Sequence, residues 1–416
     1  MTMASESQLA SFVPKLLEEL SQFGADARGG VTRLLYTAEW LEAQQYLAEQ
    51  MQELGMDVYF DRVGNLFGRL QGSSGEGPVI MTGSHIDTVQ SGGFYDGAYG
   101  VAAGIAAVAH LKETYGLPVK TLEVVSLCEE EGSRFPLTYW GSGNMVGLYD
   151  IEQGADRYDA AGTSLQEAML NCGFGKAEQR AARRSDIAAF VELHIEQGPV
   201  LERQQLSVGI VEAIVGQHRY TVTVGGTANH AGTTPMPLRR DALAGAAAMI
   251  LQLETEAILT GSPLVATVGK LTATPNTPNV IAGSVSFTVD VRHIDEPAIR
   301  EFCQTVFQQF QEIAGERELQ VTIDQWMEAA PAPMDGQLRA WLERIAKRLS
   351  LPYMVMPSGA GHDAQLLSGI CPTAMLFVPS RGGISHSPEE YTSQDHLAAG
   401  AEMLSALLYE LAYEEQ

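Results

Sequence analysis

Residues 77–89 read GPVIMTGSHIDTV, an apolar run of strand length that stops abruptly at polar residues. Three later stretches have the same form: TLEVVSLCEEEGS (121–133), IAAFVELHIEQG (187–198) and TAMLFVPSRGGISHSP (373–388). Such continuous apolar runs are typical of buried parallel strands. Between the first two lies DGAYGVAAGIAAVAHLKETYG (96–116), whose small residues predict a helix that packs closely on a sheet. Strand, helix and strand in this order predict an α/β domain with a largely parallel sheet.

The pattern changes after residue 212, where HRYTVTV (218–224) and SVSFTVDVRH (284–293) alternate apolar and polar residues. Alternation of this kind is typical of half-exposed strands. The expected order is strand (about 214–225), helix (241–257), strand (264–273), strand (284–293), helix (296–315) and strand (319–326), as in a ferredoxin-like α+β sandwich. AAPAPMDG (329–336) has the composition of a linker. We therefore expect a catalytic domain from 1–212 and 330–416, with an inserted domain from 213–329.

The composition indicates a globular protein of at least two domains, because 416 residues exceed the usual size of one. The formal net charge of −25 repels phosphate backbones and anionic lipids, so we expect no nucleic-acid or membrane partner. The N-terminal stretch lacks a basic segment followed by an apolar one, and no uninterrupted apolar run reaches membrane length, which predicts a cytoplasmic protein. The four cysteines are widely spaced without a CxxC pair, which argues against a disulfide framework or a thiolate zinc site.

Most of the nine histidines lie in short polar or glycine-rich motifs rather than at apolar core positions. His85, Glu130, Glu131 and His194 each follow or end one of the apolar runs, and His386 follows the last of them. Ligands of an open parallel sheet gather beyond the carboxyl ends of its strands. We therefore expect these side chains to meet in one crevice.

The donors in this set predict a metal site. Imidazole nitrogens and carboxylate oxygens without thiolate suit zinc, manganese or a similar divalent ion. Asp87 follows His85 at a spacing that allows a carboxylate to hold the imidazole, and Asp96 lies eleven residues after His85. Two histidine-carboxylate groups with a central Asp that could bridge are typical of sites with two ions ~3.5–4 Å apart. Of the paired Glu130 and Glu131, one would then bind metal while the other takes a proton from the attacking water.

The alternating strands predict a second kind of site. In the strand near 220 the even-numbered apolar residues share one face, which leaves Arg219 on the other, and in 284–293 the same reasoning places Arg292 with Asp290 opposite the apolar face. In a protein of charge −25, binding a carboxylate requires a local cation that can form a two-pronged hydrogen bond. Arg292 is the first choice for that role.

Eight motifs together resemble a known family: GSHIDTV, GGFYDGAYG, CEEEGSRFP, ELHIEQGPVLE, ANHAGTTPM, VDVRH, SGAGHDAQ and ISHSPEE. In this order they resemble the amidase (hydantoinase/carbamoylase) branch of the dinuclear aminoacylase/carboxypeptidase metallopeptidase superfamily, from about Phe23 to the C-terminus. That branch holds N-carbamoyl-L-amino acid hydrolases, ureidopropionases and allantoate amidohydrolases. FGADARGGVTRLLYTAEW (23–40) and EEEGSRFPLTYWGSGN (129–144) are most similar to the bacterial allantoate amidohydrolases.

The resemblance implies roles for matching residues. His85, Asp96 and His194 would bind one ion, and Asp96, Glu131 and His386 the other, so that Asp96 bridges. Glu130 would be the general base, and Asp87 would orient His85. His194 stands where the exopeptidase branch has a carboxylate, which argues against a peptidase. The implied cofactors are two divalent ions per subunit, Mn²⁺ or Zn²⁺.

The resemblance also implies how substrate is held. His230, in the inserted domain, would reach the partner subunit's active site and stabilise the oxyanion, which implies a homodimer with a dimerisation/lid domain. The implied substrate-binding residues are Gln217, Arg219, Asn279, Arg292, Gly359 and His362. We expect hydrolysis of a ureido C–N bond in a small anionic substrate, allantoate, to ureidoglycine, ammonia and carbon dioxide. The alternatives are an N-carbamoyl-L-amino acid hydrolase or ureidopropionase and, more distantly, a non-catalytic binding protein on the same fold.

Overall fold

The computed structural model describes residues 3–75 and 77–414, without the side chains of residues 3–8 and 10. It divides into two compact units. Unit 1 comprises Met1–Glu212 and Met334–Gln416, and unit 2 comprises Ala213–Pro333. The paired segments Ala213–Ile214 and Ala332–Pro333 lie where the chain leaves and re-enters unit 1, and both belong to the nine-stranded sheet described next with that unit.

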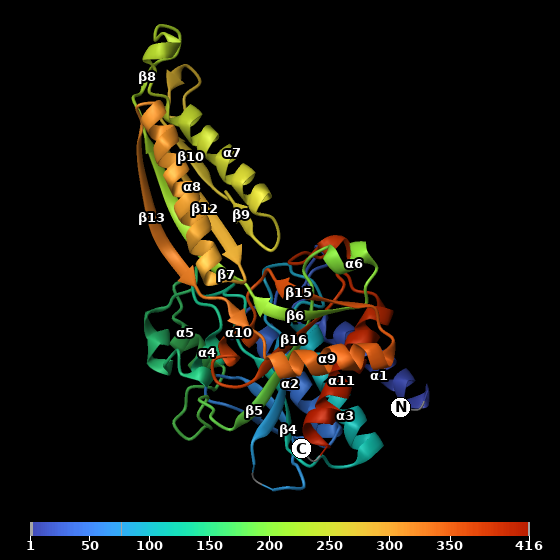
Figure 1. Cartoon of the computed structure of the whole chain (residues 1–416). Helices are drawn as coiled ribbons and strands as arrows, with labels where there is room; N and C mark the ends of the chain where they lie inside the picture. Colours follow the sequence, from blue (N-terminus) through green and yellow to red (C-terminus); the bar gives the residue numbers. More distant parts are fainter. Residues whose placement is uncertain (1–2, 76, 415–416) are drawn as a thin grey trace. The chain divides into compact units, whose positions relative to one another are not determined.

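Unit 1 contains most of the elements of the chain (Figure 1). Its helices are α1 (Met3–Leu20), α2 (Ala38–Glu53), α3 (Ala98–Tyr115), α4 (Trp140–Val146), η1 (Ile151–Asp156), α5 (Leu165–Asn171), α6 (Val200–Gln204), α9 (Gly336–Leu349), α10 (Asp363–Leu367), η3 (Arg381–Gly383) and α11 (Gln394–Ala412). The strands of its sheet are β1 (Asp57–Phe60), β2 (Leu66–Leu70), β3 (Val79–His85), β4 (Leu122–Leu127), β5 (Ile187–Ile195), β6 (Val208–Ile214), β14 (Ala332–Pro333), β15 (Tyr353–Ser358) and β16 (Thr373–Val378).

The nine-stranded sheet has the order β1-β2-β4-β3-β5-β16-β6-β14, and β15 also pairs with β6. Only its centre is parallel, where β3 pairs with β4 and β5, and β16 pairs with β5. β1 and β2 on one side, and β6 and β14 on the other, pair antiparallel. The prediction of a largely parallel sheet was therefore wrong at both sides. The turn between β1 and β2 is too short for the crossover that a parallel pair requires.

The four apolar runs that end in polar residues are β3, β4, β5 and β16, the parallel centre of the sheet. Every residue of β3, β4 and β16 is buried. Because parallel neighbours end at the same edge, the motifs that follow these strands gather there.

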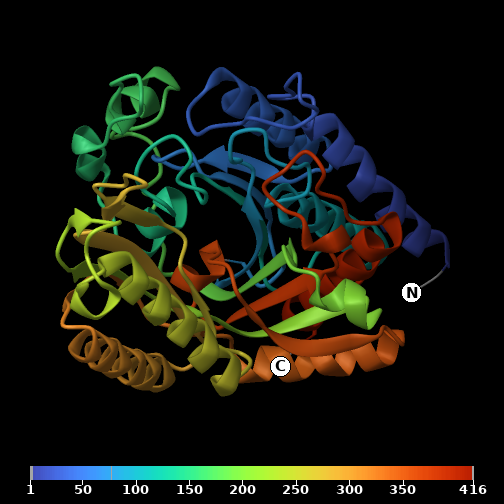
Figure 2. The ribbon, with the colours of Figure 1, turned by 90° about the horizontal axis from the view of Figure 1, so that it is seen from above.

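Helix α3 lies close to the sheet because its contact residues are small. A Cβ on Gly100 would lie 2.3 Å from the carbonyl oxygen of Leu193 in β5, so no larger residue fits at this approach. α3 also contacts α1 and α11, and α1 contacts α11. Figure 2 shows this grouping, with the first helix in dark blue beside the last in red. The two ends of the chain thus cover the same part of the core.

Unit 2 is an antiparallel sheet with two long helices. Its elements are β7 (Gly216–Gly225), β8 (Asn229–His230), η2 (Met236–Leu238), α7 (Ala242–Thr260), β9 (Val265–Thr267), β10 (Leu271–Thr274), β11 (Val280–Ile281), β12 (Ser284–His293), α8 (Glu296–Glu316) and β13 (Gln320–Ala329). The main sheet has the order β10-β12-β7-β13 with β9 also paired to β12, and β8 pairs with β11 in a separate ribbon. The stretch predicted as one strand at 264–273 is interrupted and forms β9 and β10.

One face of this sheet is buried by both helices, as Figure 1 shows for α7 and α8. Val222 and Val224 of β7 and Phe287 and Val289 of β12 form the core with residues of the two helices. The alternate residues of the same strands are only partly buried. The face with Arg219 and Arg292 is thus the one away from the helices.

Helix α7 is long and apolar enough, by length and composition alone, to cross a membrane, and 28% of its 18-residue window is buried within the molecule. The helix is not an uninterrupted apolar run, because Gln252, Glu254 and Glu256 lie within it. Its side chains Leu243, Leu251, Ile258 and Leu259 are 43 to 74% exposed.

Candidate metal centre

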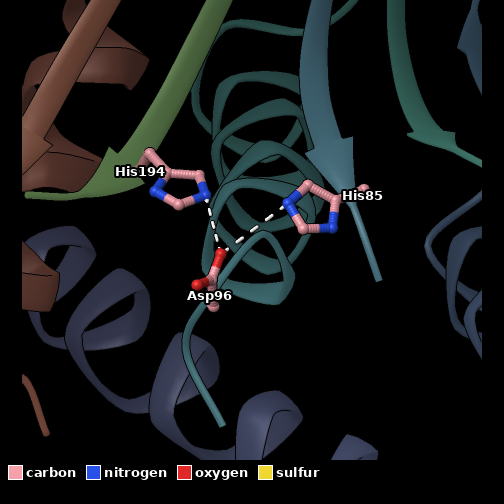
Figure 3. A group of neighbouring side chains, drawn as sticks. All are labelled: His85, Asp96 and His194. Atoms are coloured by element: carbon pink, nitrogen blue, oxygen red, sulfur yellow. Dashed lines mark ion pairs between the residues drawn. The ribbon is translucent and has the colours of Figure 1, made fainter. Parts of the chain in front are cut away.

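Three side chains from separate parts of unit 1 meet at the carboxyl edge of the parallel strands. His85 ends β3, His194 lies near the end of β5, and Asp96 comes from the loop before α3 (Figure 3). One carboxylate oxygen of Asp96, Oδ1, lies 3.2 Å from Nε2 of His194 and 3.7 Å from Nε2 of His85. All three residues are buried. Their donor atoms lie close enough together to hold one metal ion.

A second group shares Asp96. Its other oxygen, Oδ2, lies 3.3 Å from Nε2 of His386, which is 3.5 Å from Oε1 of Glu131. These three side chains again place their donor atoms within 4.8 Å of one another. Oε1 of Glu131 is buried, and the described residues offer it no hydrogen-bond donor. Asp96 is thus shared between two adjacent donor groups, one at each carboxylate oxygen.

The buried histidine rings are oriented by backbone carbonyl groups. Nδ1 of His194 lies 2.9 Å from the carbonyl oxygen of Ile195, and Nδ1 of His85 lies 3.0 Å from that of Asp87. A carbonyl oxygen can only accept, so each Nδ1 carries the proton. Nε2 of both rings therefore faces Asp96, and in the neutral ring this nitrogen is unprotonated, which is the arrangement that metal-binding histidines use.

Asp87 acts on the glutamates as well as on His85. Its carboxylate lies 3.7 Å from Nδ1 of His85, so it is the Asp87 carbonyl that makes the hydrogen bond to the ring. Oδ2 of Asp87 accepts hydrogen bonds from the backbone N–H groups of Glu130 and Glu131, at 3.0 and 3.1 Å. Asp87 therefore fixes the turn that presents both glutamates.

Glu130 borders the first donor group without belonging to either. Its Oε2 lies 3.9 Å from Nε2 of His85, and the residue is buried. Burial raises its pKa well above the ordinary value, and the negative charge of Glu131 raises it further. A carboxylate with a raised pKa is a stronger base than one in water. Glu130 is therefore a buried carboxylate of raised pKa beside the first donor group, with the basicity that proton transfer requires.

The raised pKa values in the two groups indicate that these side chains attract positive charge. Burial raises the pKa of Glu131 to about 8, and Asp96 adds to that rise. Burial opposes the protonation of His194, but the hydrogen bond and charge of Asp96 prevail and raise its pKa to about 9. The hydrogen bond to Asp96 likewise raises the pKa of His386 to about 9. Protons supply the positive charge that this cluster of carboxylates needs, and divalent ions can take their place.

Three residues that support Asp96 were missed by sequence reasoning. Nε2 of Gln197 donates to Oδ2 of Asp96 at 2.8 Å, and Oγ of Ser385 lies 2.8 Å from the same oxygen. Glu390 accepts from the backbone N–H groups of Tyr95 and Asp96 at 2.9 and 3.1 Å, which holds the loop itself. All three lie inside the quoted motifs ELHIEQG and ISHSPEE. The motifs therefore include them, although their residue types alone did not indicate a role at the site.

Of the residues predicted to bind substrate, only two lie in unit 1. His362 is buried, and its ring meets that of His194 edge to face with the centroids 4.5 Å apart. Its Nε2 is buried without a hydrogen-bond partner among the described residues. Gly359, in the same loop, is exposed. This loop therefore lines the first donor group.

The predicted residues in unit 2 form two separate groups. Gln217, Arg219 and Arg292 lie together on the face of the main sheet away from the helices. His230 lies in β8 and Asn279 directly precedes β11, its partner strand, and the backbone N–H of Ala231 donates to the carbonyl oxygen of Asn279 at 3.0 Å. Unit 2 by itself thus does not bring all five residues together.

A third group in unit 2 has donors at similar spacing. His218, Glu296 and Glu328 lie within 4.8 Å of one another. The guanidinium group of Arg300, however, pairs with Glu296 at 2.8 Å and also with Glu328. Nε2 of His218 lies 3.1 Å from Glu296. These side chains form a charge network that already includes its own cation.

Comparison with known proteins agrees with this geometry. The family model for peptidase family M20/M25/M40 matches residues 81–410. The chain is 51% identical to an allantoate amidohydrolase of Bacillus subtilis, covering 95% of this chain and 96% of that protein. It is 41% identical to an N-carbamoyl-L-amino acid amidohydrolase of Geobacillus stearothermophilus, covering 96% and 98%. A solved structure of a hydantoinase/carbamoylase family amidase from Burkholderia multivorans superimposes with a TM-score of 0.93 at 34% identity, covering 98% of each chain. The chain therefore belongs to peptidase family M20/M25/M40.

Proposed function

We propose that this protein hydrolyses a ureido C–N bond of allantoate, which releases ammonia and leaves a carbamate that breaks down to ureidoglycine and carbon dioxide. The observation that carries the proposal is Asp96 shared between two donor groups, with Glu130 bordering one of them. The similarity to an allantoate amidohydrolase over nearly the whole chain supports this substrate. A peptidase is disfavoured because His194 stands where the exopeptidase branch has a carboxylate.

The residues of the two groups fit two divalent ions, Mn²⁺ or Zn²⁺. His85, Asp96 and His194 would hold one ion, and Asp96, Glu131 and His386 the other. Two observations support this assignment: Oε1 of Glu131 is buried and accepts no hydrogen bond among the described residues, and Nδ1 of both buried histidines faces a carbonyl oxygen, so that Nε2 is the nitrogen available to an ion. When bound, the ions would polarise the ureido carbonyl group and make an attacking water more acidic.

The protein's own groups then move the protons. Glu130, held by Asp87 through its backbone N–H, takes a proton from the attacking water and delivers it to the leaving nitrogen. His230 is suited to stabilise the oxyanion, because its Nδ1 accepts from the backbone N–H groups of Gly232 and Thr233 at 3.0 and 3.1 Å. In the neutral ring the proton is then on Nε2, which leaves Nε2 as a donor.

The substrate carboxylate is assigned to Arg292, with Gln217, Arg219 and Asn279 as further contacts from unit 2. Gly359 and His362 are assigned to the ureido end, because their loop lines the first donor group. These roles suit a small anionic substrate, since arginine binds carboxylates with two parallel hydrogen bonds.

We further propose a homodimer in which His230 serves the partner's active site and unit 2 acts as the dimerisation and lid domain. The exposed Leu243, Leu251, Ile258 and Leu259 support a protein interface along α7, because solvent-exposed apolar patches of this kind mark interaction surfaces. β10, at one end of the main sheet, adds an open strand edge with Leu271 exposed. Working in the cytoplasm fits four cysteines that form no disulfide.

A second candidate is hydrolysis of N-carbamoyl-L-amino acids, favoured by the 41% identity to such an enzyme. The same metal ligands and the same base would serve either substrate. The two differ in the pocket around the second ureido group of allantoate, which an N-carbamoyl amino acid lacks.

One assay separates these functions. Metal-free protein is reconstituted with Mn²⁺ or Zn²⁺, and ammonia release is measured with allantoate, N-carbamoyl amino acids, ureidopropionate and dipeptides. We expect the highest kcat/KM with allantoate. Preference for an N-carbamoyl amino acid would transfer the assignment to the second candidate, and release from none of the ureido acids would overturn the proposal.

A further inference from the structure

Four polar side chains meet on the face of the unit 2 sheet away from the helices. Strands β7 and β12 are paired so that Arg219 lies opposite Asp290, and Gln217 lies opposite Arg292. Asp290 and Arg292 are two residues apart on β12 and therefore share this face. Their side chains are 21 and 29% exposed, and that of Arg219 is 35% exposed.

The carboxylate of Asp290 binds the other three side chains. Its Oδ2 accepts from Nε2 of Gln217 at 2.6 Å, from Nε of Arg219 at 2.9 Å and from Nη2 of Arg292 at 3.2 Å. Its Oδ1 accepts from Nε of Arg292 at 3.0 Å. Arg292 is thus held along one edge by two hydrogen bonds, which fixes the plane of its guanidinium group. Burial opposes ionisation of Asp290, yet its hydrogen bonds to Arg292 and Arg219 lower its pKa.

Arg219 is fixed from a second direction. The pairing of β13 with β7 shifts between Gln325 and Met327, so that Trp326 is an extra residue at a β-bulge. The guanidinium carbon of Arg219 lies over the ring of Trp326, 5.6 Å from the ring centroid. Trp326 is 55% exposed. Asp290 thus holds Arg219 at Nε, while the guanidinium carbon of Arg219 lies over the tryptophan ring.

We propose that Asp290 is a positioning residue that sets Arg219 and Arg292 as one carboxylate-binding unit. The inference rests on the proposed function in so far as these arginines bind the substrate carboxylate. Two guanidinium groups and one carboxylate leave a net charge of +1, in a chain whose total is −25. Flexible arginine side chains lose conformational entropy when they grip a ligand, and prior fixation by Asp290 removes part of that cost.

The proposal and the simplest alternative predict opposite changes in KM when Asp290 is replaced. If Asp290 were only a nearby negative charge, replacing it with Asn would raise the local charge from +1 to +2 and tighten the binding of an anion. If Asp290 positions the arginines, the same replacement releases them and weakens the binding. The direction of the change in KM therefore decides between the two.

The experiment compares Asp290→Asn with Asp324→Asn in the metal-loaded enzyme. Asp324 lies opposite Thr221 and so shares the sheet face with Arg219, and among the described residues no arginine is seen to donate a hydrogen bond to its carboxylate. Asp324→Asn thus makes the same charge change without releasing a guanidinium group. For Asp290→Asn we expect KM for allantoate to rise about tenfold with kcat within about twofold. For Asp324→Asn we expect KM to stay the same or fall. A KM for Asp290→Asn that is unchanged or lowered overturns the proposal.

Two further measurements keep the test decisive. The methyl ester of allantoate lacks the carboxylate. We therefore expect its kcat/KM to be equal in wild type and Asp290→Asn. An equal loss of kcat/KM for the acid and the ester would indicate general damage to the enzyme and would overturn the positioning role. If Asp290→Asn does not fold, Asp290→Glu keeps the charge but displaces the carboxylate by one methylene. It should raise KM, and a wild-type KM would count against the proposal. Turnover of allantoate by the wild-type enzyme tests the proposed function separately. If another ureido acid is the substrate, KM and kcat are compared with that acid and its ester.

Discussion

At the scale of single residues, the two adjacent glutamates of the centre face different partners. Glu131 lies with His386 and Asp96, whereas Glu130 lies beside His85 and outside both donor groups. The two share one anchor, Oδ2 of Asp87, which accepts from both backbone N–H groups. Neighbouring carboxylates can therefore differ in function because the turn directs them to different partners.

The first prediction concerns Glu130. Glu130→Gln keeps the shape of the side chain but removes its basicity, and Glu130 belongs to neither donor group of the centre. We expect both metal ions to remain, measured as two equivalents by mass spectrometry, while kcat falls by ~10²–10⁴-fold. Wild-type turnover in a fully loaded variant would place the general base elsewhere.

The second prediction concerns Asp96, whose two oxygens face different donor groups. Asp96→Asn replaces one oxygen by a nitrogen that cannot bind a cation, and it removes the negative charge from both groups. We expect metal content to fall for both ions together. The matched variant is His386→Ala, which belongs to the second group alone and should remove only one equivalent. Loss of a single equivalent from Asp96→Asn would contradict a shared carboxylate.

The sequence predicted the residues of the donor groups but not the residues that hold Asp96 and its loop by hydrogen bonds. His85, Glu131, His194 and His386 could be named because each ends or follows a recognisable apolar strand. Gln197 and Glu390 could not be singled out, because their role depends on where the chain returns to Asp96 from about a hundred and about three hundred residues away. Hydrogen bonds between such distant segments have no local sequence pattern.

At the scale of elements, periodicity found the strands but not always their partners. The buried runs at β3, β4, β5 and β16 are the four parallel strands, and the helix between the first two is α3. The antiparallel direction of the outer strands was not predicted, because it depends on short connections, such as the turn from β1 to β2, rather than on hydrophobicity. In unit 2, the interruption at Gly269 and Lys270 divides what reads as one strand into β9 and β10.

The close contact between α3 and the sheet gives the third prediction. At Gly100 an added Cβ would lie 2.3 Å from the Leu193 carbonyl oxygen, whereas at Gly315, near the end of α8, it would meet nothing within 4 Å. We expect Gly100→Ala to lower the free energy of unfolding by ~1–3 kcal/mol through overpacking. Gly315→Ala should raise it by up to ~1 kcal/mol, because alanine favours the helix. Thermal unfolding of both variants checks this, and equal stability of the two would show that the contact is not limiting.

Because Leu193 precedes His194, the same contact links packing to the metal site. A shift of β5 away from α3 would move the ring of His194 relative to Asp96, from which it now stands 3.2 Å. The Gly100→Ala variant should therefore also bind metal more weakly, whereas Gly315→Ala should not.

At the scale of the whole molecule, the chain places its predicted site residues in two units. The metal donors all belong to unit 1, and His230 and the two arginines belong to unit 2. The alternation of residues in β7 and β12 was enough to predict the sheet face that carries the arginines. No local pattern in the sequence specifies which metal centre His230 would serve in the proposed homodimer, because that depends on contacts between subunits rather than within one chain.

The last prediction tests whether His230 serves the partner subunit. A homodimer of His230→Ala lacks the oxyanion donor, and a homodimer of Glu130→Gln lacks the base, so both should be inactive. In a mixed dimer, the site with intact Glu130 on the His230→Ala chain receives an intact His230 from the other chain. Random exchange makes about half of the dimers mixed, each with one complete site, so about a quarter of wild-type activity should return if the sites act independently. Tagged pull-down first confirms that mixed dimers form. If confirmed mixed dimers remain inactive, His230 acts in its own subunit or outside catalysis, because only the crossed arrangement can restore a complete site.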